Sequence, residues 1–388
     1  MINESLYKNI ERNVISKINR FEINKEDLRE LKKTFRGKTI LISGASGSIG
    51  SQFSKDIFKY ELKLKKIIFL DKDENTLTEL NRELLVLKNF KKVEKEFICV
   101  DLNSTDIGDL LNKENVEFYL NFAAIKHVRS EENVHSIKYM FKTNSINFAP
   151  KKKHKLKKIF SISTDKTVNP SSILGVSKNL MEIHLSKFKS KDTFVSSVRF
   201  ANVSFSNGSI LKYVVDRIRQ KKEFGVPENI KRFFITHSEA SSLCFKSLLI
   251  RNNNKIIIPN PRILNKDFLI KDLTERIILN FKLNPKFYKN KNKILTDNYK
   301  NKQCYVLLTS VSDGQKTYEE LFSENENIIN DSDNTVCKVN LPPYNKRTLS
   351  LLNKILICKS INQIKTIILR EFDNYNPPIK TIKLSKTI

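Results

Sequence analysis

One stretch whose residues could carry out proton transfer contains an adjacent acid and base, Asp165 and Lys166, within "SISTDKTVNPSSILGVSK". Such a pair can move protons to and from a substrate when the surroundings tune its pKa values. Thr164 precedes the pair and offers a hydroxyl that can hydrogen-bond to a ligand hydroxyl. Lys178 follows Leu174 by four residues, so a helix would place both on one face. Taken alone, the stretch also fits a solvated surface turn.

A second stretch, "LISGASGSIG", has glycines at three-residue spacing. Gly44 permits a tight turn, Gly47 lets the backbone approach a pyrophosphate, and Gly50 lets the next helix pack on the strand. Free N–H groups at the helix N-terminus would hold the phosphates, with the hydroxyls of Ser46 and Ser48 as further donors. A glycine-rich turn without a ligand is the alternative. The strand before the loop and the helix after it favour a dinucleotide.

Acidic residues follow the next two expected strands. Asp71 ends the second strand, 21 residues after Gly50. A carboxylate there binds the adenosine ribose hydroxyls and repels a 2′-phosphate, so the pattern favours NAD over NADP. Lys72 next to it weakens that preference. At the end of the third strand, Asp101 and Leu102 are expected near the adenine.

The elements that must hold these residues form an alternating pattern of strands and helices. Six strands are expected, at residues 38–43, 65–71, 94–102, 116–124, 157–163 and 193–203. Their alternation with helical segments predicts an α/β fold with a Rossmann-type, doubly wound parallel sheet. In such sheets ligands bind beyond the carboxyl ends of the strands, where the glycine loop and the acid–base pair both fall.

Four regions are expected along the chain. Residues 1–36 form an N-terminal helical extension with Asn24 as an N-cap, and residues 37–205 form the NAD-binding Rossmann domain. Residues 206–330 form a smaller substrate-binding region that partly returns to the Rossmann domain. Residues 331–388 form a C-terminal helical segment.

Composition narrows the classes of function. The chain has 388 residues and a net charge of +28, but its lysines are spread along its whole length, as drift toward A/T-rich codons would produce. We therefore expect an anionic ligand and no dedicated nucleic-acid site. No apolar run reaches the roughly 18 residues of a membrane span, and the N-terminus lacks a secretory signal. Five widely spaced cysteines and isolated histidines predict a cytoplasmic protein with reduced thiols and no metal site.

Several segments together resemble a known family. They are the glycine loop, "NFAAIKHVRSE", "STDKTVNPSSILGVSK", "VRFANVSFSNGS", "KRFFITHSEA" and "GQKTYEELF", in this order. The combination is similar to the extended short-chain dehydrogenases/reductases, specifically the UDP-N-acetylglucosamine 4,6-dehydratases of bacterial polysaccharide biosynthesis. The likeness spans roughly residues 36–335 and makes residues 206–330 a nucleotide-sugar-binding region.

The resemblance implies a reaction and an assembly. NAD+ takes a hydride from C4 of the sugar, and the resulting ketone acidifies the C5 proton. Water is lost across C5 and C6, and the hydride returns to C6, so no net oxidation occurs. The resemblance also implies a homodimer or a larger homo-oligomer formed through helices that flank the sheet.

The resemblance also implies roles for single residues. Asp165 would be the acid for the C6 hydroxyl, Lys166 the base at C5, and Lys178 the ligand of the nicotinamide ribose, with Thr164 in the same catalytic stretch. The expected cofactor contacts are Gly44, Ser46, Gly47, Ser48, Ile49, Gly50, Asp71, Asp101, Leu102, Ala123, Ala124, Asn144 and Lys178. The expected substrate contacts are Lys126, His127, Asn202 and Arg232.

Three departures from the family pattern leave alternatives open. Leu174 replaces the usual tyrosine, so the C4 base is unassigned, with Asp165 or a water near Lys178 as candidates. "SDGQK" (312–316) replaces "RPGEK", and a short crossover joins residues 144 and 163. The alternatives are a UDP-sugar epimerase and a member that binds NAD and a nucleotide sugar without turnover. The "STDK" stretch favours the dehydratase over the epimerase.

Overall fold

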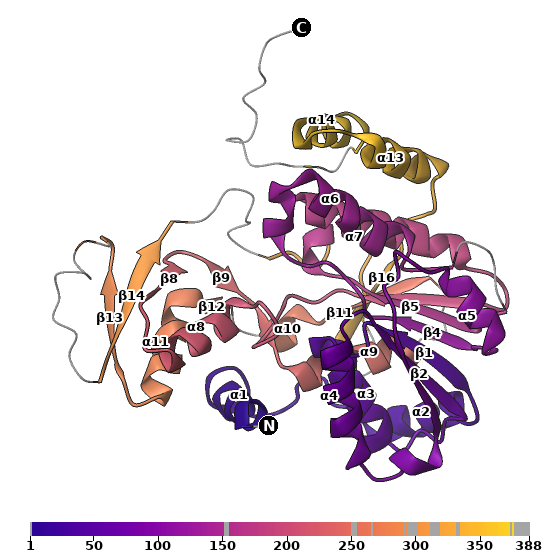
Figure 1. Cartoon of the computed structure of the whole chain (residues 1–388), viewed down its shortest axis with the longest axis horizontal. Coiled ribbons are helices and arrows are strands. Elements are labelled where there is room, and N and C mark those ends of the chain that lie inside the picture. Colours follow the sequence, from indigo (N-terminus) through magenta and orange to yellow (C-terminus); the bar gives the residue numbers. More distant parts are fainter. Residues whose placement is uncertain are drawn as a thin grey trace, which may run out of the picture.

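A computed structural model describes residues 2–150, 155–249, 254–264, 267–290, 292, 302–310, 319–330, 334–372 and 375. Figure 1 shows a large α/β body, a smaller lobe at one side, and a pair of C-terminal helices on the body. The elements below are those of the described residues. Among them, no helix is long and apolar enough to cross a membrane.

The body is built on one large sheet with the strand order β15-β16-β11-β6-β5-β4-β1-β2-β3. Strands β1 to β6 and β11 run parallel, whereas β16 is antiparallel to β11 and β15 is antiparallel to β16. The strands are β1 (Thr39–Ser43), β2 (Lys66–Asp71), β3 (Glu94–Cys99), β4 (Phe118–Asn121), β5 (Lys158–Ile162), β6 (Phe194–Val198), β11 (Lys255–Pro259), β15 (Ile329–Asn330) and β16 (Val336–Asn340).

The six expected strands are confirmed, and the sheet is of the Rossmann type. The last expected strand divides into β6 and a short β7 (Asn202–Val203), with residues 199–201 between them. The chain winds outward from β1 in both directions, through β2 and β3 on one side and β4, β5 and β6 on the other. The reversal between β1 and β4 marks the place where such sheets bind ligands.

Helices cover both faces of the sheet, and the core is the apolar layer beneath them. One face carries α3 (Ser48–Lys59) and α9 (His237–Leu249), which pack against each other. The helices α6 (Val134–Phe141) and α7 (Ile173–Leu185) pack against each other elsewhere on the sheet. The remaining helices of this body include α4 (Glu74–Leu85) and α5 (Ile107–Lys113).

The smaller lobe has its own apolar core. A parallel sheet of β8 (Phe224–Pro227), β14 (Gln303–Thr309) and β13 (Asn284–Tyr288) packs on α8 (Ile210–Arg219) and α11 (Ile270–Asn280). Short elements link the lobe to the body: β9 (Lys231–Arg232), β10 (Phe234–Ile235), α10 (Pro261–Leu264) and β12 (Phe268–Leu269). Strand β7 follows β6 in the chain and pairs with β10. The smaller lobe is therefore joined to the body near the carboxyl end of β6.

The N-terminal extension forms α1 (Ile2–Val14) and α2 (Lys25–Phe35). The expected N-cap is confirmed, because Asn24 Oδ1 accepts a hydrogen bond from the Asp27 N–H at 2.8 Å. Helix α1 adds Ile10 and Val14 to the core of the smaller lobe, whereas α2 packs on α9 of the body. The extension therefore contacts both parts of the molecule (Figure 1).

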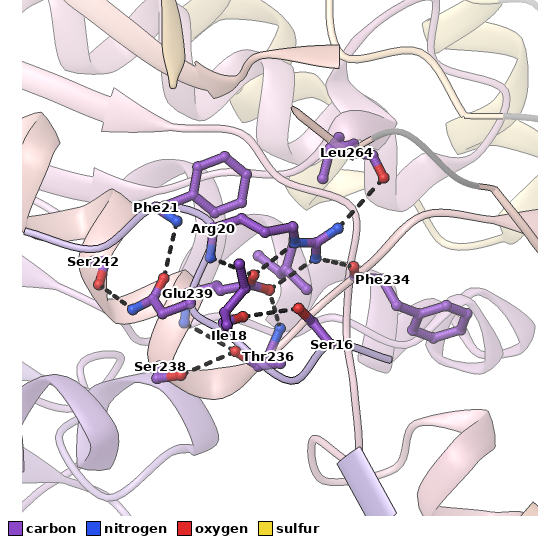
Figure 2. Close-up of polar contacts among 12 residues, drawn as sticks. Ser16, Ile18, Arg20, Phe21, Phe234, Thr236, Ser238, Glu239, Ser242 and Leu264 are labelled. Carbon is purple, nitrogen blue, oxygen red and sulfur yellow. Dashed lines mark hydrogen bonds and ion pairs between the residues drawn. The ribbon is translucent and has the colours of Figure 1, made fainter. Parts of the chain in front are cut away.

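Arg20 fixes the segment between these two helices. Its guanidinium forms two hydrogen bonds with the carboxylate of Glu239, at 2.7 and 2.9 Å, and donates to the Phe234 carbonyl at 2.8 Å. The Glu239 side chain is fully buried at the first turn of α9. Figure 2 shows Arg20 reaching from the N-terminal segment toward Glu239, Phe234 and Leu264. One ion pair thus connects the extension, α9 and β10.

The C-terminal helices α13 (Lys346–Ile357) and α14 (Ile361–Glu371) lie on α6 and α7 (Figure 1). Their contact is a separate apolar cluster. Its buried members include Ile137, Phe141, Ile173, Val176, Leu180, Leu351, Leu352, Ile355, Ile364 and Ile368. Helix α9 and strands β11 and β15 belong to the body, so residues 206–330 contribute to both parts.

Candidate nucleotide-binding and catalytic site

The glycine loop joins β1 to α3 at the strand reversal, and two of its positions have no room for a side chain. Gly44 has a φ of +70°, and a Cβ there would lie 2.4 Å from the Ala123 backbone nitrogen. A Cβ on Gly50 would lie 2.2 Å from the Gly44 carbonyl oxygen. Gly47 is the N-cap of α3, so the first N–H groups of the helix follow it directly. Helix and loop are therefore packed closely, as a pyrophosphate cradle requires.

Asp71 faces this loop. Its carboxylate accepts a hydrogen bond from the Ser46 N–H at 3.0 Å and another from the Lys72 N–H at 2.8 Å. The Ser46 hydroxyl lies 2.8 Å from the Thr76 hydroxyl at the start of α4. The carboxylate at the end of β2 thus lies beside the loop, where a ribose of a bound dinucleotide would be held.

Asp101 is engaged by protein groups. One oxygen accepts a hydrogen bond from Tyr139 Oη at 2.5 Å and the other from the Asn103 N–H at 2.8 Å. Lys72 Nζ lies 3.2 Å from the same Tyr139 oxygen. Leu102, which follows Asp101 in the chain, is buried. Tyr139 was not expected from the sequence, since it lies 38 residues from Asp101.

Asn144 acts on the backbone of the segment that follows β4. It is fully buried in a π-helical turn, Lys142–Ile146, that extends α6. Its amide pairs with the N–H and the carbonyl of Ile125, both at 2.9 Å, and donates to Ser177 Oγ at 3.0 Å. Asn144 therefore holds the chain that carries Ala123 and Ala124, both half-buried.

Lys126 and His127 are exposed at the end of this segment. The His127 ring lies against Gly208, where a Cβ would be 2.4 Å from the ring and φ is +71°. Burial of its inner part and the charge of Lys126 lower the pKa of His127. Ser48 Oγ accepts a hydrogen bond from the Asn207 N–H at 3.0 Å, so residues 207–208 connect α3 to His127. Ile49 packs against the main core.

The acid–base pair lies on a 3-10 turn, Asp165–Thr167, directly beyond β5. Thr164 Oγ1 donates to Asp165 Oδ1 at 2.7 Å, and Lys166 Nζ lies 3.2 Å from the same oxygen. Asp165 is buried, whereas the Lys166 side chain is 37% exposed. Burial opposes the charge of Lys166, but the carboxylates of Asp165 and Glu319 outweigh it and raise the lysine pKa. Without a ligand, the proton therefore rests on Lys166.

Helix α7 packs against this turn through Gly175, a contact that was not predicted from the sequence. A Cβ on Gly175 would lie 2.3 Å from the Lys166 carbonyl oxygen, so only glycine allows this approach. Leu174 is buried beside it, and its N–H donates to Glu131 Oε1 at 2.9 Å. Leu174 therefore presents only an apolar side chain at the site.

Lys178, on the same face of α7 as Leu174, is buried. Its Nζ donates to the Ile162 carbonyl at the end of β5, at 2.6 Å. Burial lowers the pKa of Lys178 to about 8, although Glu182 partly opposes this shift. A lysine with such a pKa is partly neutral near physiological pH.

Asn202 and Arg232 converge on Glu319, for which the sequence predicted no role. Asn202 Nδ2 hydrogen-bonds to Glu319 Oε1, and Arg232 Nε lies 3.4 Å from the same oxygen. The Phe233 N–H donates to Glu319 Oε2 at 2.9 Å. These contacts bring β7, β9 and residue 319 together across more than a hundred residues of sequence.

A buried ionic network connects β6 to α7 next to the turn that carries Asp165 and Lys166. Arg199, at the end of β6, contacts Glu182 of α7 at 2.6 Å and Glu326 at 2.8 Å. Ser163 Oγ donates to Glu182 at 2.6 Å. The carboxyl ends of β5 and β6 are thus tied to α7 beside the acid–base pair.

Some expectations fall on residues outside the described part of the chain. These include "SDGQK" (312–316) and part of the crossover between residues 144 and 163, at residues 151–154. Within the described part, no group of three or more histidine, cysteine, aspartate or glutamate side chains is arranged to hold a metal ion.

Comparison with known proteins gives one family and similar folds. Residues 40–340 match the family described as "Polysaccharide biosynthesis protein". The capsular polysaccharide biosynthesis protein CapD of Staphylococcus aureus is 30% identical, over 77% of this chain and 47% of the relative. The uncharacterized membrane protein MJ1061 of Methanocaldococcus jannaschii is 30% identical, over 87% of this chain and 98% of the relative.

Among solved structures, the dTDP-glucose 4,6-dehydratase DesIV of Streptomyces venezuelae, with NAD and TYD bound, has a similar fold. The TM-score is 0.55 at 12% identity, over 87% of this chain and 99% of that one. This likeness concerns the fold. The chain spans about half of the length of the Staphylococcus relative.

Proposed function

The chain belongs to the polysaccharide biosynthesis protein family, and from this premise we propose that it dehydrates UDP-N-acetylglucosamine to a UDP-4-keto-6-deoxy-N-acetylhexosamine. One observation carries the proposal: the Asp165–Lys166 pair lies beyond β5, at the same edge of the sheet as the glycine loop. A pair in that place can serve a sugar held beside a dinucleotide.

NAD is the cofactor that these residues fit. The loop leaves no room for a side chain at Gly44 and Gly50, and Asp71 lies beside it. The structurally similar DesIV is described with NAD bound. When bound, NAD supplies a hydride acceptor for C4 and returns the hydride to C6. We assign Lys178 to the nicotinamide ribose and Asp71 to the adenosine ribose.

The proton chemistry follows from the pair itself. In the resting state Lys166 holds the proton and Asp165 is its ion-pair partner. Transfer of that proton within the pair gives a neutral amine and a carboxylic acid. Lys166 can then take the C5 proton while Asp165 gives its proton to the departing C6 hydroxyl, which leaves as water. The C4 hydroxyl loses its proton to a water near Lys178 when the hydride leaves C4, and Lys166 returns a proton to C5 when the hydride reaches C6. The proton held by that water then passes to Lys166, so the pair ends as it began.

The substrate class rests on charge and on the family resemblance. A UDP-sugar carries a diphosphate, and Arg232 lies near the acid–base pair. Guanidinium groups bind phosphate in a bidentate manner. We assign Arg232 and Asn202 to the nucleotide sugar, with Lys126 and His127 at the exposed side of the site.

The test is incubation of the purified protein with UDP-N-acetylglucosamine and NAD, followed by mass spectrometry of the nucleotide sugar. We expect a product that has lost one water and carries a carbonyl group. An isomer of unchanged mass, distinguished from the substrate by proton NMR of the same mixture, would identify an epimerase instead. Binding without any product would identify a member that binds the nucleotide sugar without turnover.

A further inference from the structure

Lys72 is a cation next to the carboxylate that we assign to the adenosine ribose, but its side chain has another partner. The Lys72 N–H donates to Asp71 Oδ1 at 2.8 Å, so the two residues meet at the backbone. The Lys72 ammonium group instead lies 3.2 Å from Tyr139 Oη, on helix α6. An exposed lysine that could serve a phosphate on the ribose is therefore directed to Tyr139.

Tyr139 links this cation to a second carboxylate. Its hydroxyl donates to Asp101 Oδ2 at 2.5 Å and accepts a hydrogen bond from Lys72 Nζ. An ammonium group, a hydroxyl and a carboxylate thus form one chain of hydrogen bonds, from the end of β2 through α6 to the residues that follow β3. Hydrogen bonds that involve an ionised group are stronger than those between neutral groups.

The fold holds both Tyr139 and Asp101 in place. Helix α6 is anchored by Phe141, which is fully buried. Asp101 Oδ1 accepts a hydrogen bond from the Asn103 N–H at 2.8 Å, and Asn103 Nδ2 donates to Thr143 Oγ1 at 2.7 Å in the π-helical turn that extends α6. The carboxylate of Asp101 is therefore presented to Tyr139 in one position.

We propose that Tyr139 is a specificity-determining residue for the cofactor, because it binds the ammonium group of Lys72 and keeps it from a phosphate on the adenosine ribose. NADP differs from NAD by a 2′-phosphate, which a nearby basic side chain accommodates in proteins that bind NADP. While Lys72 is bound to Tyr139, it does not offset the carboxylate of Asp71, which repels that phosphate. The contact with Tyr139 thus removes the opposing effect of Lys72 that the sequence alone suggested.

This inference rests on the proposed function only for the place of the adenosine ribose beside Asp71. It involves no sugar and no chemical step. Binding of the two dinucleotides can therefore test it separately from turnover.

The test is calorimetric titration of the full-length protein with NAD and with NADP at low salt, after charcoal has removed any dinucleotide that copurifies. The quantity compared is the ratio of the dissociation constant for NADP to that for NAD, in which effects common to both ligands cancel. The proteins are the wild type, Y139F, Y139L, K72M and the double variant Y139F with K72M. Y213F is the matched control, because it makes the same substitution on α8 of the smaller lobe.

We expect the wild type to bind NAD more tightly than NADP. Y139F loses the hydroxyl that holds Lys72, so the ammonium group can pair with the 2′-phosphate and the ratio should fall about threefold to fivefold, as one exposed ion pair allows. Y139L also removes the ring, whose centroid lies 5.0 Å from Lys72 Nζ, and should fall at least as far. The double variant should return to the wild-type ratio, added salt should reduce the gain in Y139F, and Y213F should match the wild type.

K72M covers the case in which the Tyr139 variants do not fold, because Lys72 is exposed and its replacement should leave the fold intact. We expect K72M alone to keep the wild-type ratio. Weaker binding of NADP relative to NAD in K72M would show that Lys72 already contacts the 2′-phosphate, and it would overturn the proposal. An unchanged ratio in Y139F, or an equal fall in Y139F and in the double variant, would also overturn it.

The result separates this inference from the proposed function. The expected ratios in a protein that yields no dehydrated sugar would overturn the proposed function alone. Dehydration by a protein whose ratio does not respond to Y139F would overturn this inference alone. A wild type that binds neither dinucleotide would overturn both.

Discussion

At the scale of single residues, Asp165 and Lys166 differ in their access to solvent, and a substrate can therefore approach the lysine directly. Asp165 is buried and shares one oxygen between Thr164 and Lys166. We predict that Lys166→Ala and Asp165→Asn each lower the rate of dehydration about 10²- to 10⁴-fold, the usual loss for one positioned acid or base. Turnover by mass spectrometry and NAD binding by calorimetry would be measured on the same samples.

Leu174→Met is the matched control for that pair of variants. It exchanges one buried apolar side chain for another of similar volume, so turnover should stay close to the wild type. Lys166→Ala should also stop exchange of the C5 proton with deuterated water. Wild-type turnover in Lys166→Ala would show that another group is the base.

Lys178 gives a prediction about the pH dependence of stability. Its pKa is lowered to about 8 in the folded protein, whereas an unfolded lysine has a pKa of about 10.4. Below pH 8 the folded state must bury a charge. Between pH 8 and 10.4 the folded state has lost this proton while the unfolded state still holds it, so stability rises with pH.

Comparison with Lys178→Met isolates this contribution. Relative to the variant, the wild type should gain up to about 3 kcal/mol of unfolding free energy between pH 7 and pH 10. Urea denaturation at both pH values would measure the difference, and other titrating groups cancel in it. A difference that did not change with pH would mean that Lys178 keeps an ordinary pKa.

The sequence identified the residues that a local pattern marks, and it missed those defined by distant contacts. Asp165 and Lys166 are neighbours in the chain, and Asp71 follows a strand whose end could be predicted. Glu319 is 117 residues from Asn202, and nothing in its own segment indicates a buried carboxyl. Gly175 lies inside a helix, where its close approach to Lys166 becomes visible only after the helix has packed.

At the scale of elements, strands that belong to local βα units could be predicted from the sequence, whereas strands paired through distant contacts could not. The first six followed from apolar runs alternating with helices, because each βα unit is local in sequence. Strands β11 and β16, which complete the sheet, pair with each other antiparallel across residues 255–340. Such a pairing leaves no periodic signal in either strand, so the sequence did not show how the sheet is extended.

Arg20 and Glu239 carry a prediction about how the N-terminal extension is held. Arg20→Met leaves the fully buried carboxylate of Glu239 without its cation, and breaking a buried pair typically costs about 3–5 kcal/mol. Replacing both residues, as Arg20→Met with Glu239→Gln, should cost clearly less than the sum of the single changes. Urea denaturation of the four proteins in this cycle would give the coupling.

The exposed pair Lys354–Glu371 is the control for this cycle. Its side chains are 49% and 34% exposed, and such pairs contribute about 0–1 kcal/mol. Lys354→Met should therefore change stability little. Equal losses for Arg20→Met and Lys354→Met would show that the buried ion pair does not hold the extension.

At the scale of the whole molecule, the C-terminal helices decide which surface a second copy can use. The family resemblance predicts self-association through helices that flank the sheet, and this remains a prediction. Helices α6 and α7 already bury their apolar side chains beneath α13 and α14. A homo-oligomer of the full chain must therefore use another surface, or first displace these two helices.

Removing the two helices tests this arrangement. A chain ending at residue 344 would uncover the apolar side chains of α6 and α7, among them Ile137, Phe141, Ile173 and Val176. Contiguous apolar patches of a few hundred Å² mark interaction surfaces or cause aggregation. We predict that this shortened chain self-associates more strongly than the full chain, as measured by light scattering over a range of concentrations.

A chain ending at residue 375 keeps both helices and should behave like the full-length protein. In the full chain, Leu352→Asp with Ile355→Asp places charges in the same contact and should reproduce the effect of the short truncation. If the short chain and the double variant both kept the mass of the full-length protein at every concentration, α13 and α14 would not be shielding an association surface.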